Sequence, residues 1–216
     1  LLQSGLAIKS ILLGIISLTL FWSLQWKNMR FTFTEANLLP DDHPENILYK
    51  SFTKTFGEEG NVIVIAFQDS LFFTQKNREA WKLLNEKIES FEEINFVLST
   101  ENLQELVKNN KGGNFFLKKV SDDFPPNKKN NEKFKQKLFL ELPFYNNLLF
   151  DKKSSTIRSV IYMDSEIVNT ALRKDFIFEI FIPLIKKFEK ESEVDVRISG
   201  MPYIRTLNAQ NIVDEI

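Results

Sequence analysis

The sequence predicts an α+β protein in which a sheet with helices on one face follows an N-terminal membrane helix. Two observations carry this prediction: an uncharged apolar segment near residue 20, and two separate strand–helix–strand patterns downstream of residue 60. Two such units that share one sheet, in the order βαββαβ, are typical of a ferredoxin-like sandwich. We therefore expect a ferredoxin-like domain tethered to a bilayer.

The apolar segment lies between Lys9 and Lys27, where 17 consecutive residues carry no formal charge. As a helix they would measure about 26 Å, just enough to cross a bilayer. Trp22 and Trp26 would anchor its end at the interface. A cleaved signal peptide is the main alternative, but no small-x-small cleavage pattern follows, and a buried core helix is the third reading. We expect a retained membrane helix over residues 11–26.

The first strand–helix–strand unit begins with the β-branched run NVIVIAF. This run predicts a strand over residues 61–68 that is central in the sheet and buried on both faces. Thr74 is suited to cap a helix over residues 75–91, whose stripe includes Trp81, Leu84 and Ile88. A second strand should follow over residues 94–98, through a right-handed crossover.

The second unit opens with a hairpin, in which residues 148–150 pair with a strand over residues 156–163. Ser165 is suited to cap a helix over residues 167–190, and alternation of apolar and charged residues predicts a last strand over residues 194–198. Pro183 interrupts that helix and should kink or split it, because proline removes a backbone donor. Gly200 and Pro202 should reverse the chain at the start of another helix.

Residues 100–147 form an insertion, rich in Lys and Asn, between the two units. Gly112-Gly113 and Pro125-Pro126 break it into short segments, and we expect helices over residues 101–109 and 133–140 that do not join the sheet. Its lysines are most simply solvated, although they are also suited to anionic lipid headgroups or a partner subunit. Its phenylalanines are either core or an apolar substrate wall; the candidates for substrate contact are Phe115, Phe116 and Phe144.

The composition excludes most site chemistries. Charges balance, with 28 Lys and Arg against 29 Asp and Glu, so nucleic acid is not an expected partner. The chain has no Cys and a single His, His43, which leaves no catalytic triad or thiolate metal site. The cluster of Asp41, Asp42, His43 and Glu45 lacks the glycine turn of a calcium loop. Nucleotide-binding glycine loops are absent from the sequence, so we expect no cofactor, no metal and no enzymatic activity.

Several segments, in their order, resemble a known family. The membrane segment is followed by LLPDD at residues 38–42, YKSFTKTFG at 49–57 and the strand NVIVIAF. Further on come NNLLFDKKSSTIRSVIYM at 146–163 and ISGMPYIRTLNAQNI at 198–212. This order resembles the first part of MMPL-like and Patched-like permeases of the resistance-nodulation-division (RND) superfamily, over nearly the whole chain.

The resemblance implies a domain organisation. Residues 1–30 would be the first transmembrane helix with its flanks, 31–60 a membrane-proximal connection, and 61–200 a porter domain with the insertion at 100–147. Residues 201–216 would begin the helix that leads to the next membrane segment. Since the chain starts with Leu1 and stops inside a helical run, we expect it to be a fragment of a longer protein.

The resemblance also implies a function. Such permeases export hydrophobic or lipid-like molecules across the bacterial inner membrane by ion-gradient-driven alternating access, with the porter loop in the periplasm. The local charge count, with Lys27 and Arg30 after the helix, alone favours the opposite orientation. Expected partners are membrane lipids, substrate, the rest of the permease chain with its second porter loop, and a second copy of the chain in a homo-oligomer. Two alternatives stay open: a single-pass, membrane-tethered module that binds a protein, and a signal-anchored extracytoplasmic enzyme.

Overall fold

The computed structural model describes residues 2–25, 40, 42–56, 60–69, 72–109 and 113–215. The chain divides into two compact units, residues 1–35 and 36–216, and each is described by itself. Residues 26–30 of the predicted membrane segment and its flank, and residues 31–39, 41 and 57–59 of the predicted connection, lie outside the described residues.

The first unit contains α1 (Leu2–Leu24), a helix of 23 residues. Its described side chains, from Ile8 onward, are exposed and almost all apolar, with Lys9 as the charged exception. The segment predicted to be helical is therefore helical up to Leu24. Within the residues that the structure describes, no helix combines the length and the apolar character needed to cross a bilayer.

A helix that was not expected, α2 (Pro44–Phe56), occupies the predicted membrane-proximal connection. Its start carries ordinary helix signals, because Pro44 is the first residue and Glu45 lies in the first turn, near the positive end of the helix dipole. Lys54 lies in the last turn, where a positive charge is favoured. Residues 49–56, most of the motif YKSFTKTFG, are therefore helical, although the sequence analysis predicts no helix there.

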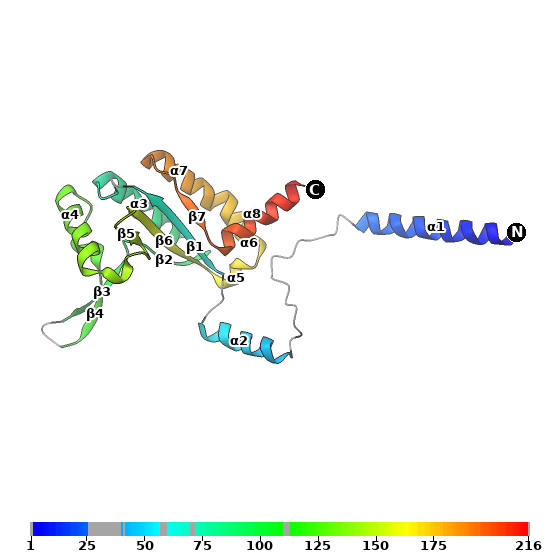
Figure 1. The fold of residues 1–216 in the computed structure, drawn as a ribbon, viewed down its shortest axis with the longest axis horizontal. Coiled ribbons are helices and arrows are strands. Elements are labelled where there is room, and N and C mark those ends of the chain that lie inside the picture. The colour runs from blue at the N-terminus through cyan, green and yellow to red at the C-terminus, as the bar shows by residue number, and fades with distance from the viewer. Residues whose placement is uncertain are drawn as a thin grey trace. The chain divides into compact units, whose positions relative to one another are not determined.

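The second unit is built on an antiparallel sheet, so the fold is α+β (Figure 1). The strands that form its main path are β1 (Val62–Gln68), β2 (Ile94–Leu98), β6 (Thr156–Met163) and β7 (Arg197–Ser199), in the order β2-β6-β1-β7. A short strand, β5 (Phe150–Asp151), pairs with β6 as the predicted hairpin requires. The prediction that four separate segments share one sheet is confirmed, although β7 is shorter than expected and begins later.

One face of this sheet is covered by α3 (Gln75–Glu89) and α7 (Ile182–Ser192). The Phe67 ring of β1 packs against both, with its centroid 4.9 Å from that of Trp81 and 5.8 Å from that of Phe188. Both helices therefore lie on the same face, as predicted. The β1 side chains alternate between buried and half-buried, so the prediction that β1 is buried on both faces was wrong. Helices cover the sheet on one side, and the β1 side chains that alternate with the buried ones, Val62, Val64 and Ala66, are half-buried.

The second long helix is divided into four parts. These are α5 (Ser165–Val168), α6 (Ala171–Asp175), the π-helical segment η5 (Phe176–Phe181) and α7. Asp164, not Ser165, caps α5, and Thr170 caps α6 by accepting a hydrogen bond from the Leu172 backbone N–H. Pro183 lies in the first turn of α7, directly after the π-helical turn, so the predicted break is confirmed.

The insertion forms structure of its own (Figure 1). Its elements are β3 (Gln104–Lys108), β4 (Phe115–Lys119), η2 (Val120–Asp123), α4 (Lys128–Gln136), η3 (Lys137–Glu141) and η4 (Pro143–Tyr145). The prediction of a helix over residues 101–109 was wrong, because that segment pairs with β4 as a two-stranded sheet. The helix expected over residues 133–140 exists and begins earlier, at Lys128.

The last helix, α8 (Met201–Asp214), begins at a sharp turn on Gly200. The φ angle of Gly200 is +118°, and a Cβ atom there would lie 2.2 Å from the Val62 carbonyl oxygen. Glycine is therefore required, both for its backbone angle and for close packing on β1. Pro202 lies in the first turn, so the predicted chain reversal is confirmed.

Candidate functional site

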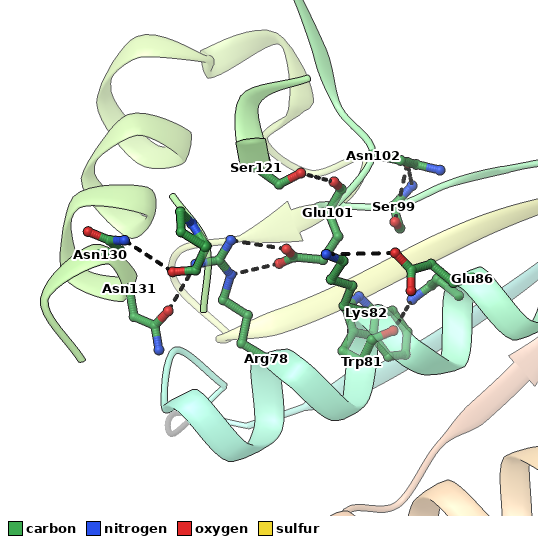
Figure 2. A network of polar contacts seen from close by, with 12 residues as sticks. Arg78, Trp81, Lys82, Glu86, Ser99, Glu101, Asn102, Ser121, Asn130 and Asn131 are labelled. Atoms are coloured by element: carbon green, nitrogen blue, oxygen red, sulfur yellow. Dashed lines mark hydrogen bonds and ion pairs between the residues drawn. The ribbon is translucent and has the colours of Figure 1, made fainter. Parts of the chain in front are cut away.

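A buried ion pair joins the insertion to the sheet-covering helix α3 (Figure 2). The Arg78 side chain is fully buried, and that of Glu101 is 4% exposed. Arg78 donates two hydrogen bonds to the Glu101 carboxylate, from Nε at 2.9 Å and from Nη2 at 3.0 Å. This two-point geometry fixes the position of both side chains more tightly than a single contact would.

The rest of the Arg78 guanidinium is satisfied by the insertion. Its Nη1 donates to Asn131 Oδ1 of α4 at 2.9 Å, and its Cζ lies 3.7 Å from the centroid of the Phe134 ring. A buried charge of this kind is tolerated only when its hydrogen-bond donors are occupied. Otherwise the cost of removing the charge from water, on the order of several kcal/mol, is not offset by the attraction between the two ions. The aromatic face of Phe134 adds an electrostatic attraction.

The electrostatic balance at Glu101 is set mainly by burial. Burial raises the pKa of the Glu101 carboxyl above its ordinary value, and the hydrogen bonds and charge of Arg78 lower it by less. Ser121 Oγ also donates to the Glu101 backbone carbonyl at 2.5 Å, which ties η2 to the same turn. Three parts of the insertion, namely the turn at Glu101, η2 and α4, therefore converge on one arginine of α3.

A cavity of about 430 Å³ lies between the edge strand β2 and the insertion. We refer to it as the edge cavity. Its apolar lining comes from both sides, and consists of Phe96, Val97 and Leu98 from β2 with Leu117 from β4 and Tyr145 from η4. The Phe96 ring is held in place by stacking on Tyr162, with centroids 4.2 Å apart. Polar side chains complete the lining, namely Glu89, Asn102, Gln104 and Lys119, so the edge cavity is a mixed surface between sheet and insertion.

A smaller hollow of about 100 Å³, here called the polar recess, adjoins the edge cavity. The two share three lining residues: Glu89, Asn102 and Lys119. The rest of the lining of the polar recess is almost entirely polar, and consists of Lys82, Asn85, Glu86, Ser99, Glu101, Ser121 and Asp122. The polar recess and the edge cavity are therefore neighbours with these three residues in common.

The three phenylalanines predicted for substrate contact are exposed. Phe115 and Phe116 lie on β4 with 61% and 48% of their surface accessible, and Phe144 on η4 is 80% exposed. None of the three is among the described residues that line the edge cavity, although their chain neighbours Leu117 and Tyr145 are. The prediction that these phenylalanines contact substrate stays a prediction.

Two polar residues of the site were missed by the sequence analysis. Arg78 and Asn85 lie three residues before and four residues after Trp81, on the buried stripe of α3. A charged and an amide side chain at core positions of an amphipathic helix require buried partners. That break in the apolar stripe was the signal, and it would have pointed to a polar network under the insertion.

Among the described residues, no three His, Asp or Glu side chains are arranged so that they could hold a metal ion. His43 Nδ1 lies 2.6 Å from Glu45 Oε2 in an exposed position, and Asp41 lies outside the described residues. A search with protein-family models gives no match for the sequence. A search of curated proteins gives no relative either.

Proposed function

We propose that the chain is the first membrane helix and the first extracytoplasmic porter domain of an exporter of the RND superfamily. The complete exporter would move hydrophobic or amphiphilic, lipid-like molecules out of the bacterial inner membrane by ion-gradient-driven alternating access. The domain itself would be a non-enzymatic wall of the substrate path, with the porter loop in the periplasm.

The observation that carries the proposal is the order of the strands. The path β2-β6-β1-β7, in which each neighbouring pair is antiparallel, supports a ferredoxin-like βαββαβ domain. One connection contains α3 and the other contains α5, α6, η5 and α7, which cover a single face.

The apolar character of α1 is the second support. From Ile8 to Leu24 its side chains are exposed, and Phe21 and Trp22 lie near its end. The described part is not a complete span by itself, so the proposal requires the flanking residues, with Trp26 and Lys27 as the interfacial anchors, to complete it. The proposed partners are membrane lipids, the substrate, the rest of the permease chain and a possible second copy.

The topology can be tested with reporter fusions. A periplasm-active phosphatase and a cytoplasm-active galactosidase would each be fused after Gly60, with fusions before Lys9 as controls. We expect phosphatase activity alone after Gly60, and a mature protein that still contains α1. Galactosidase activity after Gly60, or cleavage near Lys27, would contradict the proposal.

The transport role can be tested in the full-length exporter. Replacing Phe115, Phe116 and Phe144 singly with Ala should impair export while membrane insertion and abundance stay unchanged, because exposed side chains contribute little to folding. Normal export by all three variants would show that these residues are not part of a substrate wall.

A second candidate, a single-pass protein-binding module, is favoured by the β3-β4 hairpin. Leu106 and Leu117 are paired across it and are both 64% exposed, so the hairpin presents apolar side chains to its surroundings. The gene sequence beyond Ile216 separates the two candidates. Further membrane spans support the permease, whereas a stop codon supports the tethered module.

A further inference from the structure

We propose that one face of the β3-β4 hairpin lies against the surface of a phospholipid bilayer and favours anionic lipids there. This contact rests on the proposed function, in which α1 brings the domain to a membrane, and it adds the part of the domain that meets the lipid. We call this surface the hairpin face. By the alternation of side chains along paired strands, it consists of Gln104, Leu106 and Lys108 of β3 with Phe115, Leu117 and Lys119 of β4.

Three large apolar side chains of the hairpin face are exposed. Leu106 and Leu117 are paired across the hairpin and are each 64% exposed, and Phe115, two residues before Leu117, is 61% exposed. Figure 1 shows β3 and β4 extending as an arm away from α4 and the main sheet. Apolar side chains gathered on a projecting surface indicate a contact with something outside the domain.

The opposite face of the hairpin contacts the insertion itself. Glu105 Oε2 of β3 lies 2.7 Å from Lys137 Nζ of η3, and Lys118 Nζ of β4 lies 2.5 Å from Asp123 Oδ1 of η2. The charges of that face are therefore compensated within the domain. The hairpin face points the other way, and its base adjoins the edge cavity, which Leu117 also lines.

The charge of the hairpin face is positive. Its two charged positions are Lys108 and Lys119, and neither forms an ion pair with another described residue. Lysines beside apolar side chains suit a bilayer surface, because their stems pack with the apolar groups while the ammonium reaches a lipid phosphate. Lys119 lies at the base, where it shares the polar recess with Glu89 and Asp122. Lys108, near the turn, is therefore the cation to test.

The size and charge of the hairpin face favour lipid over protein. Its six side chains are few beside the roughly 20–30 residues that each side of a stable protein interface contributes. A second copy of the chain would bring lysines against lysines, with no carboxylate of the hairpin face between them. A bilayer needs no such area, because α1 would already hold the domain at the membrane and so supply a high effective concentration.

The backbone of the hairpin limits how deeply it can enter lipid. Among the described residues β3 and β4 form a two-stranded sheet, so each strand has an outer edge whose backbone groups need water or another polar partner. The hydrocarbon of a bilayer offers neither. We therefore expect Leu106, Phe115 and Leu117 to reach the upper acyl region while the strands stay among the head groups.

Fluorescent labels on adjacent residues test which face meets lipid. The chain has no native Cys, so Leu106→Cys, Val107→Cys, Phe115→Cys and Phe116→Cys each accept one environment-sensitive nitrobenzoxadiazole label. The whole chain would be reconstituted in vesicles of phosphatidylcholine and phosphatidylglycerol that contain a lipid with a nitroxide near its head group. Quenching should be about threefold or more stronger at 106 and 115 than at 107 and 116, because neighbouring residues point to opposite faces. Equal quenching within both pairs, or none, would overturn the proposal.

Single-lysine variants test the lipid preference. With the label at residue 115, Lys108→Gln should lower the equilibrium constant for lipid contact, obtained from the quenched fraction, about fivefold. Lys133→Gln on α4, an exposed lysine of the same insertion, is the control and should change it less than about twofold. Vesicles of phosphatidylcholine alone should lower the constant at least as much as Lys108→Gln does. Equal effects of the two variants would show a response to net charge alone and would contradict contact through the hairpin face.

Failure of this test is distinguishable from failure of the proposed function. Flotation of the vesicles after carbonate extraction reports, in every sample, whether the chain is inserted. An inserted chain whose labels show no alternation contradicts the hairpin contact and leaves the exporter proposal standing. A label whose emission depends on protein concentration, without quenching by the nitroxide lipid, would indicate a protein partner and would also overturn the lipid contact.

A chain that does not insert contradicts the exporter proposal instead. The same labelled variants would then be added to preformed vesicles of phosphatidylcholine and phosphatidylglycerol. Quenching with the same alternation would uphold the hairpin contact, and its absence would overturn it.

Discussion

The sheet with its helices and the inserted hairpin use the same kinds of side chain in opposite ways. Phe67 on β1 is almost completely buried, between Trp81 and Phe188, whereas Phe116 on β4 is about half exposed. The central sheet has two helices on one face, and the two-stranded hairpin forms a separate sheet. Phenylalanine therefore marks core in one region and accessible apolar surface in the other, and the surrounding elements decide which.

The test with the largest expected effect replaces one phenylalanine in each region with alanine. Phe67→Ala should lower the free energy of unfolding by about 4 kcal/mol, because it removes a buried ring and leaves a cavity. Phe116→Ala should change it by less than about 0.5 kcal/mol, because the side chain is about half exposed on the separate hairpin. Denaturant titration followed by circular dichroism measures both. Similar losses in the two variants would show that the hairpin is packed as core.

The joint between the two regions should be nearly as sensitive. Arg78→Met removes the guanidinium and leaves the Glu101 carboxylate buried without its partner, which should cost about 3 kcal/mol. The double variant Arg78→Met/Glu101→Leu should recover part of that loss, since neither charge is then buried. If the single variant is as stable as the wild type, the ion pair does not hold the insertion in place.

A backbone position in the sheet region should show a smaller effect. Gly200→Ala places a Cβ against the Val62 carbonyl and strains a positive φ angle, so it should cost about 2 kcal/mol. Gly113, which also has a positive φ but has open space around its Cβ position, is the matched control in the hairpin. Gly113→Ala should cost about 1 kcal/mol, from backbone strain alone. A larger loss of unfolding free energy for Gly113→Ala than for Gly200→Ala would contradict this prediction.

The smallest expected effect is a pH dependence at the joint. Burial raises the pKa of Glu101 above its ordinary value of 4.5, so the folded protein holds that proton more tightly than the unfolded chain does. The contribution of Glu101 to stability should therefore fall as pH rises from 4.5 through the raised pKa. Glu101→Gln should remove this slope, measured as the difference in unfolding free energy between wild type and variant across pH 4 to 8. A difference that does not vary with pH would contradict the raised pKa.

Most of the sheet region was predictable because its signals are periodic. The β-branched run at residues 61–68 and the stripe of α3 indicate one burial pattern each, and Pro183 marked the division of the second helix. Burial on one face of β1 instead of two was not predictable, because a wholly apolar strand carries no alternation from which its faces can be distinguished.

The insertion was less predictable, and so was the site beside it. The segment QELVK of β3 has no strong strand signal of its own, and its strand structure depends on pairing with β4 across a turn. The edge cavity depends on which side chains of β2, β4 and η4 meet, which no local pattern specifies. Only Arg78 and Asn85 could have been found from the sequence, as polar side chains on the apolar stripe of α3.

The turn at Gly200 has a mechanical consequence. The first residue of α8 follows directly on a contact with the backbone of β1, and the Arg173 Nε–H of α6 donates to Thr206 Oγ1 one turn further along α8 at 3.1 Å. A rotation of α8 about its start would drive Gly200 into Val62 and pull on Arg173. These two contacts, at Gly200 and at Thr206, therefore oppose rotation of α8 about its start. A displacement of α8 near Asp214 would accordingly be transmitted to the central strand β1.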